Sequence, residues 1–290
     1  MDYQWYPGHM TKARRMMEEN IGLVDLVIEL TDARIPMSSR NPDIDRLCGN
    51  KARILVMTKA DMADPAKTAA FQEIFESQGM MVLAVDARTR KANDRIRSYV
   101  EKACAAKRER DRRRGIIGRP LRAMVVGIPN VGKSTFINSF CGRAGAKTGN
   151  KPGVTKGKQW IRMNRNLELL DTPGILWPKF DEPQVGINLA LTGAIRQELL
   201  EEQELSLSLL KFLQTHYPEL LLAKYCSGRD KWELPMEEAQ LLTKIAQARN
   251  LLRTGGEPDY QRAAKLVLDD FRNGRTGRIT LEMPQEGAEQ

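Results

Sequence analysis

The feature that most constrains this chain is a glycine-rich loop, Gly127 to Thr135, which fits the pattern G-x-x-x-x-G-K-[ST]. An apolar run, residues 123–126, precedes the loop and predicts a buried parallel strand, and residues 135–140 can continue as a helix. In this context the backbone N–H groups of the loop cradle phosphates. We therefore expect a nucleotide site in which Lys133 reaches the β- and γ-phosphates and the Ser134 hydroxyl binds Mg²⁺. The loop residues expected to contact the nucleotide are Asn130, Val131, Gly132, Lys133, Ser134 and Thr135.

The bulk properties of the chain narrow the class of protein further. Its 290 residues allow two domains, and 41% hydrophobic with 29% charged residues is ordinary for a globular protein. The net charge is +9, and because residues 196–290 are net acidic, the positive charge lies in the first 195 residues. This charge favours a polyanionic partner. Four scattered cysteines and two histidines predict neither disulfides nor a zinc site. With no membrane-length apolar stretch and no signal peptide, we expect a cytoplasmic protein without a membrane partner.

Strand and helix patterns alternate through the first part of the chain. This alternation predicts a doubly wound α/β domain with a mostly parallel sheet over residues 1–183, and the helical pattern that follows predicts a smaller α-helical domain over residues 184–290. The strand candidates are residues 23–30, 53–57, 80–85, 123–126, 159–163 and 167–170.

A charged linker interrupts this alternation. Residues 91–107 form an amphipathic helical pattern that runs into residues 107–122, which are rich in Lys and Arg. The linker is either a solvated extension of the helix or a contact for RNA phosphates. The basic residues between positions 249 and 278 leave a similar choice, between an RNA-binding face and ordinary surface charge.

A second motif, Asp171 to Gly174, follows a strand candidate with the sequence D-T-P-G. Its aspartate would supply an acid near the Mg²⁺, and the Gly174 N–H would contact the γ-phosphate. Thr155, between the two motifs, is the candidate for a switch threonine that binds Mg²⁺ only when the γ-phosphate is present; the alternative is a surface-loop threonine.

A third motif, T-K-x-D at Thr58 to Asp61, predicts which base is bound. The carboxylate of Asp61 can accept hydrogen bonds from both N1–H and the exocyclic amine of guanine, whereas adenine offers no such pair of donors. A base that leaves the carboxylate unpaired is rejected. The stem of Lys59 can lie along the purine, and Thr58 can tie this loop to the phosphate loop.

The motif order is unusual, because the T-K-x-D box precedes the phosphate loop, whereas most guanine-nucleotide switches have the opposite order. Each motif still lies at the C-terminal end of a strand, so one sheet edge can gather them all, which predicts a circularly permuted GTPase. The W-[YF]-P-G-H-M start, D-A-R-I-P at Asp32–Pro36, T-K-A-D, G-I-P-N-V-G-K-S-T, P-G-V-T and D-T-P-G resemble the ribosome biogenesis GTPase A family. The region from Arg249 to Arg278 resembles that family's tail.

This resemblance implies a factor that binds the large ribosomal subunit or its precursor late in assembly and hydrolyses GTP to leave. It also implies a C-terminal helical domain that contacts ribosomal RNA, and we expect a monomer away from the ribosome. In that family, the loop that contacts the guanine base usually has the sequence Ser-Ala, whereas this chain has Asp86 and Ala87. The backbone N–H of Ala87 can still contact the guanine carbonyl.

Hydrolysis needs a group that orients water, and the position just after D-x-x-G is Ile175, which cannot do so. We expect slow basal turnover that ribosomes and potassium stimulate. Asn130 resembles an asparagine that helps to hold K⁺ in related GTPases, or it stabilises its loop. His9 resembles a catalytic histidine of the family, or it packs at a helix start. The expected catalytic group is thus His9, Asn130, Lys133, Thr155 and Gly174.

Two other functions are compatible with parts of the pattern. An RNA-binding scaffold with nucleotide binding but negligible hydrolysis would explain Ile175. An ATP-dependent small-molecule kinase would use the phosphate loop, but the T-K-x-D motif argues against it.

Overall fold

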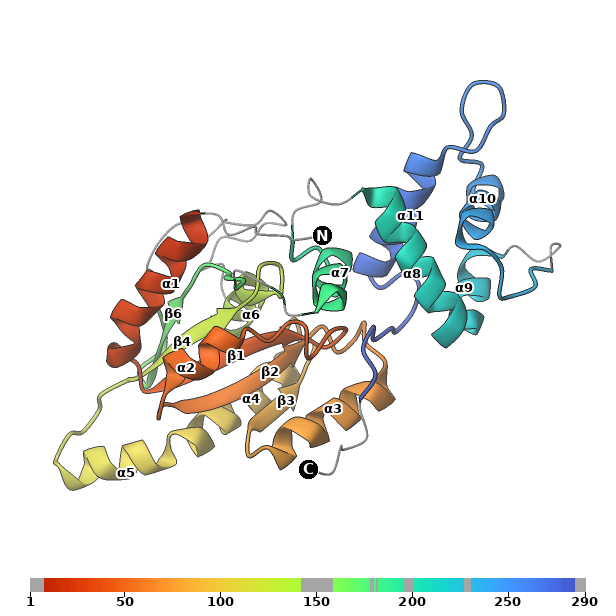
Figure 1. The fold of residues 1–290 in the computed structure, drawn as a ribbon. Coiled ribbons are helices and arrows are strands. Elements are labelled where there is room, and N and C mark those ends of the chain that lie inside the picture. The colour runs from red at the N-terminus through yellow and green to blue at the C-terminus, as the bar shows by residue number, and fades with distance from the viewer. Residues whose placement is uncertain are drawn as a thin grey trace. The chain divides into compact units, whose positions relative to one another are not determined.

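A computed structural model describes residues 8–141, 159–177, 180, 182–195, 201–226 and 231–284 (Figure 1). The chain divides into two compact units, of which the first comprises residues 1–182 with 282–290 and the second Pro183–Leu281. The tail returns to the first unit at Glu282, whose carboxylate accepts hydrogen bonds from the backbone N–H groups of Met37 and Ser38 at 2.6 and 2.8 Å. Among the described helices, none has both the length and the apolar character needed to cross a membrane.

The first unit is built on one six-stranded sheet, in the order β3-β2-β1-β4-β6-β5. Neighbouring strands are parallel except for β5 and β6, which form an antiparallel pair. This confirms the predicted doubly wound, mostly parallel fold. The strands are β1 (Leu26–Asp32), β2 (Ala52–Thr58), β3 (Met81–Ala84), β4 (Leu121–Gly127), β5 (Gln159–Asn164) and β6 (Leu167–Asp171).

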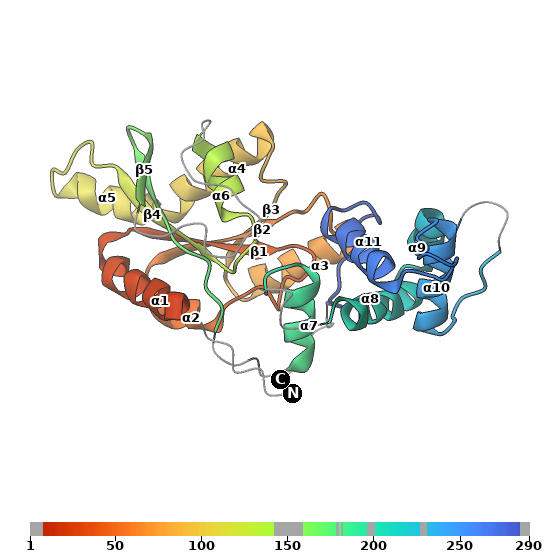
Figure 2. The ribbon, with the colours of Figure 1, turned by 90° about the horizontal axis from the view of Figure 1, so that it is seen from above.

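Helices cover both faces of this sheet (Figure 2). On one face lie α1 (Gly8–Asn20), α2 (Pro42–Cys48) and α3 (Pro65–Ser77), whose apolar side chains pack against β1, β2 and β4. On the other face lie α4 (Arg90–Ala103) and α6 (Lys133–Cys141). A short 3₁₀ turn, Ile21–Leu23, connects α1 to β1, so the first strand starts later than the apolar pattern predicts. Side-chain caps at Asn41, Asp64 and Thr89 begin α2, α3 and α4.

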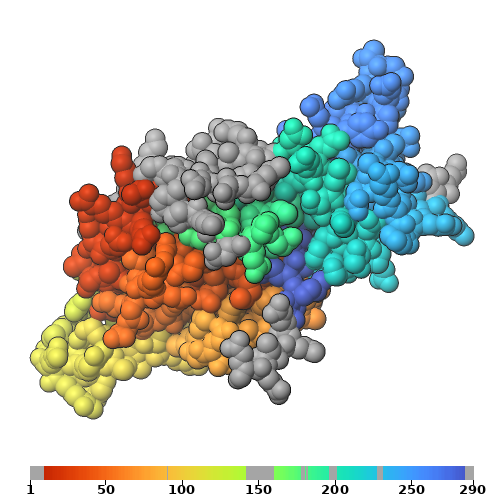
Figure 3. Space-filling model, in the orientation of Figure 1, coloured from red at the N-terminus to blue at the C-terminus, as the bar shows by residue number. Residues whose placement is uncertain are grey.

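The helix predicted over residues 91–107 is divided in the structure. It ends at Ala103, and a second helix, α5 (Ala105–Arg113), continues after the buried Cys104. The reason is that the apolar periodicity of α4 stops there: α5 has no buried residue and is polar on all sides. Figure 3 shows α5, in yellow, as an exposed end of the first unit. The linker is therefore partly helical and solvated, and its contact with RNA stays a prediction.

The second unit consists of helices in its described part. Helices α8 and α11 pack against each other, α10 packs against both, and α7 and α9 pack against α8. Leu209, Leu213, Ile245, Val267 and Phe271 form part of its buried core. The helices are α7 (Pro183–Leu191), α8 (Glu202–His216), α9 (Pro218–Tyr225), α10 (Glu238–Ala248) and α11 (Tyr260–Arg272).

Candidate nucleotide-binding site

The phosphate loop joins the central strand β4 to α6, and its backbone takes conformations that few side chains allow. Gly127 has φ of 154°, and a Cβ atom built there would lie 2.6 Å from the carbonyl oxygen of Leu30. Gly132 has φ of 102°, and Asn130, a residue type that tolerates this region, has φ of 57°. The glycines of the motif therefore meet a steric requirement of this loop, as expected for a backbone that closes around phosphates.

Lys133 lies inside this loop. Its side chain is buried, and its Nζ donates hydrogen bonds to the backbone carbonyls of Gly127 at 3.0 Å and Ile128 at 2.7 Å. Burial lowers the pKa of Lys133 to about 8, although the carboxylate of Asp171 acts in the opposite direction. A cation held at the mouth of a loop of backbone N–H groups suits the phosphates of a nucleotide.

The D-T-P-G motif at the end of β6 lies against the phosphate loop. Asp171 is buried, and the Thr172 hydroxyl donates to the carbonyl of Val125 in β4 at 2.6 Å. A Cβ atom on Gly174 would lie 2.7 Å from the backbone of Pro129 and 2.8 Å from the Nζ of Lys133. The predicted motif thus meets the predicted loop, and only a glycine fits the contact.

Oxygen donors for a magnesium ion are available at this place. Ser134 follows Lys133 on α6 with a half-buried side chain, and Asp171 supplies a buried carboxylate whose charge interacts with Lys133. Hydroxyl and carboxylate oxygens are the ligands that Mg²⁺ prefers. The side chains therefore fit the ion that the sequence predicts.

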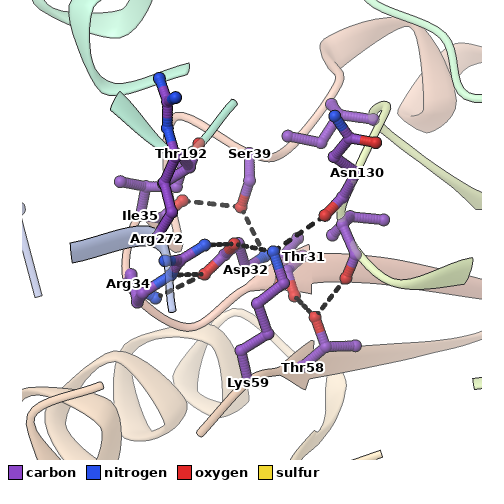
Figure 4. A network of polar contacts seen from close by, with 12 residues as sticks. Thr31, Asp32, Arg34, Ile35, Ser39, Thr58, Lys59, Asn130, Thr192 and Arg272 are labelled. Atoms are coloured by element: carbon purple, nitrogen blue, oxygen red, sulfur yellow. Dashed lines mark hydrogen bonds and ion pairs between the residues drawn. The ribbon is translucent and has the colours of Figure 1, made fainter. Parts of the chain in front are cut away.

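The base-recognition loop follows β2 and is bonded to the phosphate loop (Figure 4). The Thr58 hydroxyl lies 2.7 Å from the carbonyl of Val131 and 2.9 Å from that of Thr31. The Nζ of Lys59 donates to the carbonyl of Asn130 at 2.8 Å. Two side chains of the T-K-x-D motif therefore connect the loop that would read the base to the loop that would bind the phosphates.

Sequence reasoning missed the residues that hold Lys59 in place. Asp32 ends β1, and Arg34 donates to both of its carboxylate oxygens, from Nε at 2.9 Å and from a terminal nitrogen at 2.8 Å (Figure 4). The Nζ of Lys59 binds the same carboxylate at 2.8 Å. Burial alone would raise the pKa of Asp32, but the charges of Arg34 and Lys59 outweigh it and hold the pKa well below its usual value. We call Asp32–Arg34 the buried turn, because both charged side chains are 1% exposed.

The same local structure recurs at the end of β3. Arg88 donates to Asp86 from its backbone N–H at 3.0 Å, from Nε at 2.9 Å and from a terminal nitrogen at 3.1 Å. That terminal nitrogen also donates to Asp61 of the T-K-x-D motif at 2.6 Å. We call Asp86–Arg88 the exposed turn, because the Arg88 side chain is 58% exposed. The repeated tripeptide Asp-Ala-Arg at two strand ends was the signal that could have revealed both turns.

Other predicted site residues are only partly covered by the described chain. Thr155 lies outside the described residues, as does the side chain of His9, whose backbone belongs to the first turn of α1. Thr135 is exposed on α6, and Ala87, the middle residue of the exposed turn, is buried. Ile175 is 1% exposed and packs in the core beneath α1 and α2, so it does not face a nucleotide. The proposed roles of His9, Asn130 and Thr155 stay predictions.

The sheet order explains how motifs in an unusual sequence order meet. Strand β4, which carries the phosphate loop, lies between β1 and β6, and β2, which carries T-K-x-D, lies beside β1. All four strands are parallel, so their C-terminal ends share one edge of the sheet. This is the architecture of a circularly permuted P-loop GTPase.

Comparison with known proteins identifies the family. Residues 122–223 match the domain family described as 50S ribosome-binding GTPase. The chain is 46% identical over 287 residues to ribosome biogenesis GTPase A of Priestia megaterium, covering 99% of this chain and 98% of that one. It is 43% identical over 290 residues to the protein of the same name in Bacillus cereus, covering 100% and 97%. The chain belongs to the ribosome biogenesis GTPase A family.

A solved structure agrees with this assignment. The GNP-bound structure of YlqF from T. maritima is 27% identical, with a TM-score of 0.64, and the match covers 94% of this chain and 99% of that one. Family membership makes the protein a GTPase, which uses GTP and GDP with Mg²⁺.

Proposed function

We propose that this GTPase is an assembly factor that acts in late maturation of the large ribosomal subunit, and that it binds the subunit or its precursor through ribosomal RNA. The names of its relatives support this role. The observation that carries the nucleotide part is the pair of contacts from Thr58 and Lys59 to the phosphate loop. These contacts hold a base-reading carboxylate, Asp61, and a phosphate cradle in one frame, which is what selective binding of one nucleoside triphosphate requires.

Each part of the nucleotide has a proposed partner. Asp61 accepts from the N1–H and amine of guanine, the Ala87 N–H contacts the guanine carbonyl, and Asp86 shapes that loop. The phosphates lie in the loop from Asn130 to Thr135, with Lys133 at the β- and γ-phosphates and the Gly174 N–H at the γ-phosphate. Ser134, Asp171 and Thr155 hold Mg²⁺, which neutralises negative charge on the phosphates.

The proposed catalysis depends on the ribosome. Ile175 is apolar and buried, so it cannot orient the attacking water, and basal turnover is slow. His9 acts as the water-positioning or proton-accepting group, and Asn130 helps to hold K⁺, whose charge would stabilise the transition state. Ribosomal particles and potassium therefore stimulate turnover. Basic residues of α5 and of the second unit contact RNA, and the protein is a cytoplasmic monomer when away from the ribosome.

Replacing Asp61 with asparagine tests the base assignment. The amide of Asp61→Asn can donate to the C2 carbonyl of xanthine but cannot accept two hydrogen bonds from guanine. We expect GDP affinity to fall by about 10²-fold and affinity for the xanthosine diphosphate to rise, measured with fluorescent nucleotide analogues. Asp94→Asn, which changes an exposed acid on α4, is the matched control and should leave both affinities unchanged. Unchanged GDP binding by Asp61→Asn would overturn the base assignment.

A second candidate is an RNA-binding scaffold that binds nucleotide with negligible hydrolysis, and the burial of Ile175 favours it. Multiple-turnover GTP hydrolysis, measured with and without large ribosomal subunits in potassium and in sodium, separates the two functions. The assembly-factor proposal expects turnover to rise with subunits and potassium, whereas the scaffold expects none in any of the four conditions.

A further inference from the structure

The base-recognition carboxylate already has a partner within the chain. A terminal nitrogen of Arg88 lies 2.6 Å from Oδ2 of Asp61, and the other contacts of the same guanidinium bind Asp86 at 2.9 and 3.1 Å. The loop that carries Arg88 is also bonded to the base-recognition loop, because the Ala60 N–H donates to the carbonyl of Val85 at 3.3 Å. Arg88 is therefore held beside Asp61 by its own backbone and by Asp86.

The chemistry of this contact matches that of the expected ligand. Guanine presents N1–H and a 2-amino group on one sp² carbon, so the edge that Asp61 would read is a cyclic guanidine. The side chain of arginine ends in the same group of N–H donors on one sp² carbon, with a positive charge in addition. Arg88 and guanine therefore compete for one carboxylate by the same kind of hydrogen bond.

We propose that Arg88 is a built-in competitor of guanine, which occupies Asp61 in the nucleotide-free protein and must leave before the base can bind. The inference rests on the proposed role of Asp61 and adds a regulator to that site. Asp86 is the residue that holds Arg88 near Asp61: it accepts from Nε and from the same terminal nitrogen that donates to Asp61, so the guanidinium stays close to Asp61 and can return to it when the base leaves. A serine at position 86 would lack the second acceptor oxygen for this bidentate contact.

The contact is weak enough to be displaced. The Arg88 side chain is 58% exposed and that of Asp61 is 27% exposed, so water and salt screen their attraction. An exposed pair of this kind reduces the fraction of protein that is ready to bind by a factor of about 2 to 6. Because the competitor acts on the free protein, it lowers the association rate of guanine nucleotides and leaves their dissociation rate nearly unchanged.

The test is stopped-flow association of fluorescent GDP with the full chain. We expect Arg88→Ala to raise the association rate constant by about 2- to 6-fold without changing the dissociation rate constant. Arg88→Lys retains the charge but not the planar group of donors, so it should raise the association rate constant as well. Arg97→Ala, which removes a similarly exposed, ion-paired arginine from α4, is the matched control and should leave both rate constants unchanged.

Two results would overturn the inference and are distinguishable from failure of the proposed function. If Arg88→Ala lowers the association rate constant while Arg88→Lys retains it, Arg88 attracts the nucleotide and does not compete with it. If Asp61→Asn shifts the base preference but Arg88→Ala changes neither rate constant, the competitor alone is refuted. If Asp61→Asn leaves GDP binding intact, the base assignment is refuted and the competitor with it. A rate advantage of Arg88→Ala that shrinks from 0.05 to 0.5 M salt would support the ion-pair origin.

Discussion

The buried turn and the exposed turn have the same sequence, Asp-Ala-Arg, and almost the same internal hydrogen bonds. In both, the arginine donates from its backbone, from Nε and from a terminal nitrogen to the aspartate two residues earlier. Both follow parallel strands of one sheet, and each contacts one charged residue of the T-K-x-D motif. They differ in burial: Arg34 is 1% exposed and Arg88 58%.

This difference separates a structural role from a regulatory one. In the buried turn, the charges of Asp32 and Arg34 have no water to replace a lost partner, so these two side chains are fixed together and Asp32 holds the partly exposed ammonium of Lys59. In the exposed turn, water can solvate each group, and the contact between Arg88 and Asp61 can open at low cost. The same local hydrogen bonds therefore fix Lys59 of the base-recognition loop in place and hold Asp61 of that loop reversibly.

The largest expected effect comes from Asp32→Asn, which removes the charge at the centre of the buried turn. The buried guanidinium of Arg34 and the partly exposed ammonium of Lys59 would then lose the charge that neutralises them, so we expect the free energy of unfolding to fall by about 3–5 kcal/mol. Urea unfolding of nucleotide-free protein, followed by circular dichroism, measures the change. An unchanged urea midpoint would show that burial of the turn does not make its charges essential.

The pKa of Asp32 determines how the difference in unfolding free energy between wild type and Asp32→Asn depends on pH. Because Arg34 and Lys59 hold it below the ordinary value of 3.8, the carboxylate stabilises the protein at pH values above 3.8 and loses that contribution only as pH falls through the lower, folded-state pKa. The difference between wild type and Asp32→Asn should therefore be constant from pH 5 to 7.5.

A smaller effect is expected from Thr58→Val, which changes the base-recognition loop and leaves the charged side chains of both turns in place. Valine matches the shape of threonine but cannot donate the hydroxyl hydrogen bond that Thr58 shares between the carbonyls of Val131 and Thr31. Because this site is buried, we expect a loss of about 1–2 kcal/mol in unfolding free energy. Thr243→Val removes an exposed hydroxyl from α10 and is the matched control. Equal effects of the two variants would contradict a role for Thr58 between the loops.

Sequence reasoning succeeded at positions where the nucleotide site restricts which residue the backbone allows. A side chain in place of Gly127 would collide with Leu30, and one in place of Gly174 would collide with Pro129. Both positions therefore require glycine, and the phosphate-site motifs can be recognised in the sequence. The two turns have the same sequence, Asp-Ala-Arg, so this sequence does not show that one turn is buried and the other exposed. Their burial depends on which strands and helices surround them. The contact of Arg88 with Asp61 requires that β2 and β3 be neighbours, which is a property of the sheet order. The break at Cys104 was not predicted, because helix-forming residues lie on both sides of it.

The smallest effect on stability is expected from Asp86→Asn, which makes in the exposed turn the same change that Asp32→Asn makes in the buried turn. The hydrogen bond from Arg88 lowers the pKa of Asp86, but both groups are solvated, so we expect unfolding free energy to change by less than about 0.5 kcal/mol. The same variant should raise the association rate constant of GDP, because Arg88 loses the carboxylate that holds it beside Asp61. Urea unfolding and stopped-flow association on one preparation measure both quantities. If Asp86→Asn destabilised the protein as much as Asp32→Asn, exposure would not be what distinguishes the two turns, and the reversible role of Arg88 would lose its physical basis.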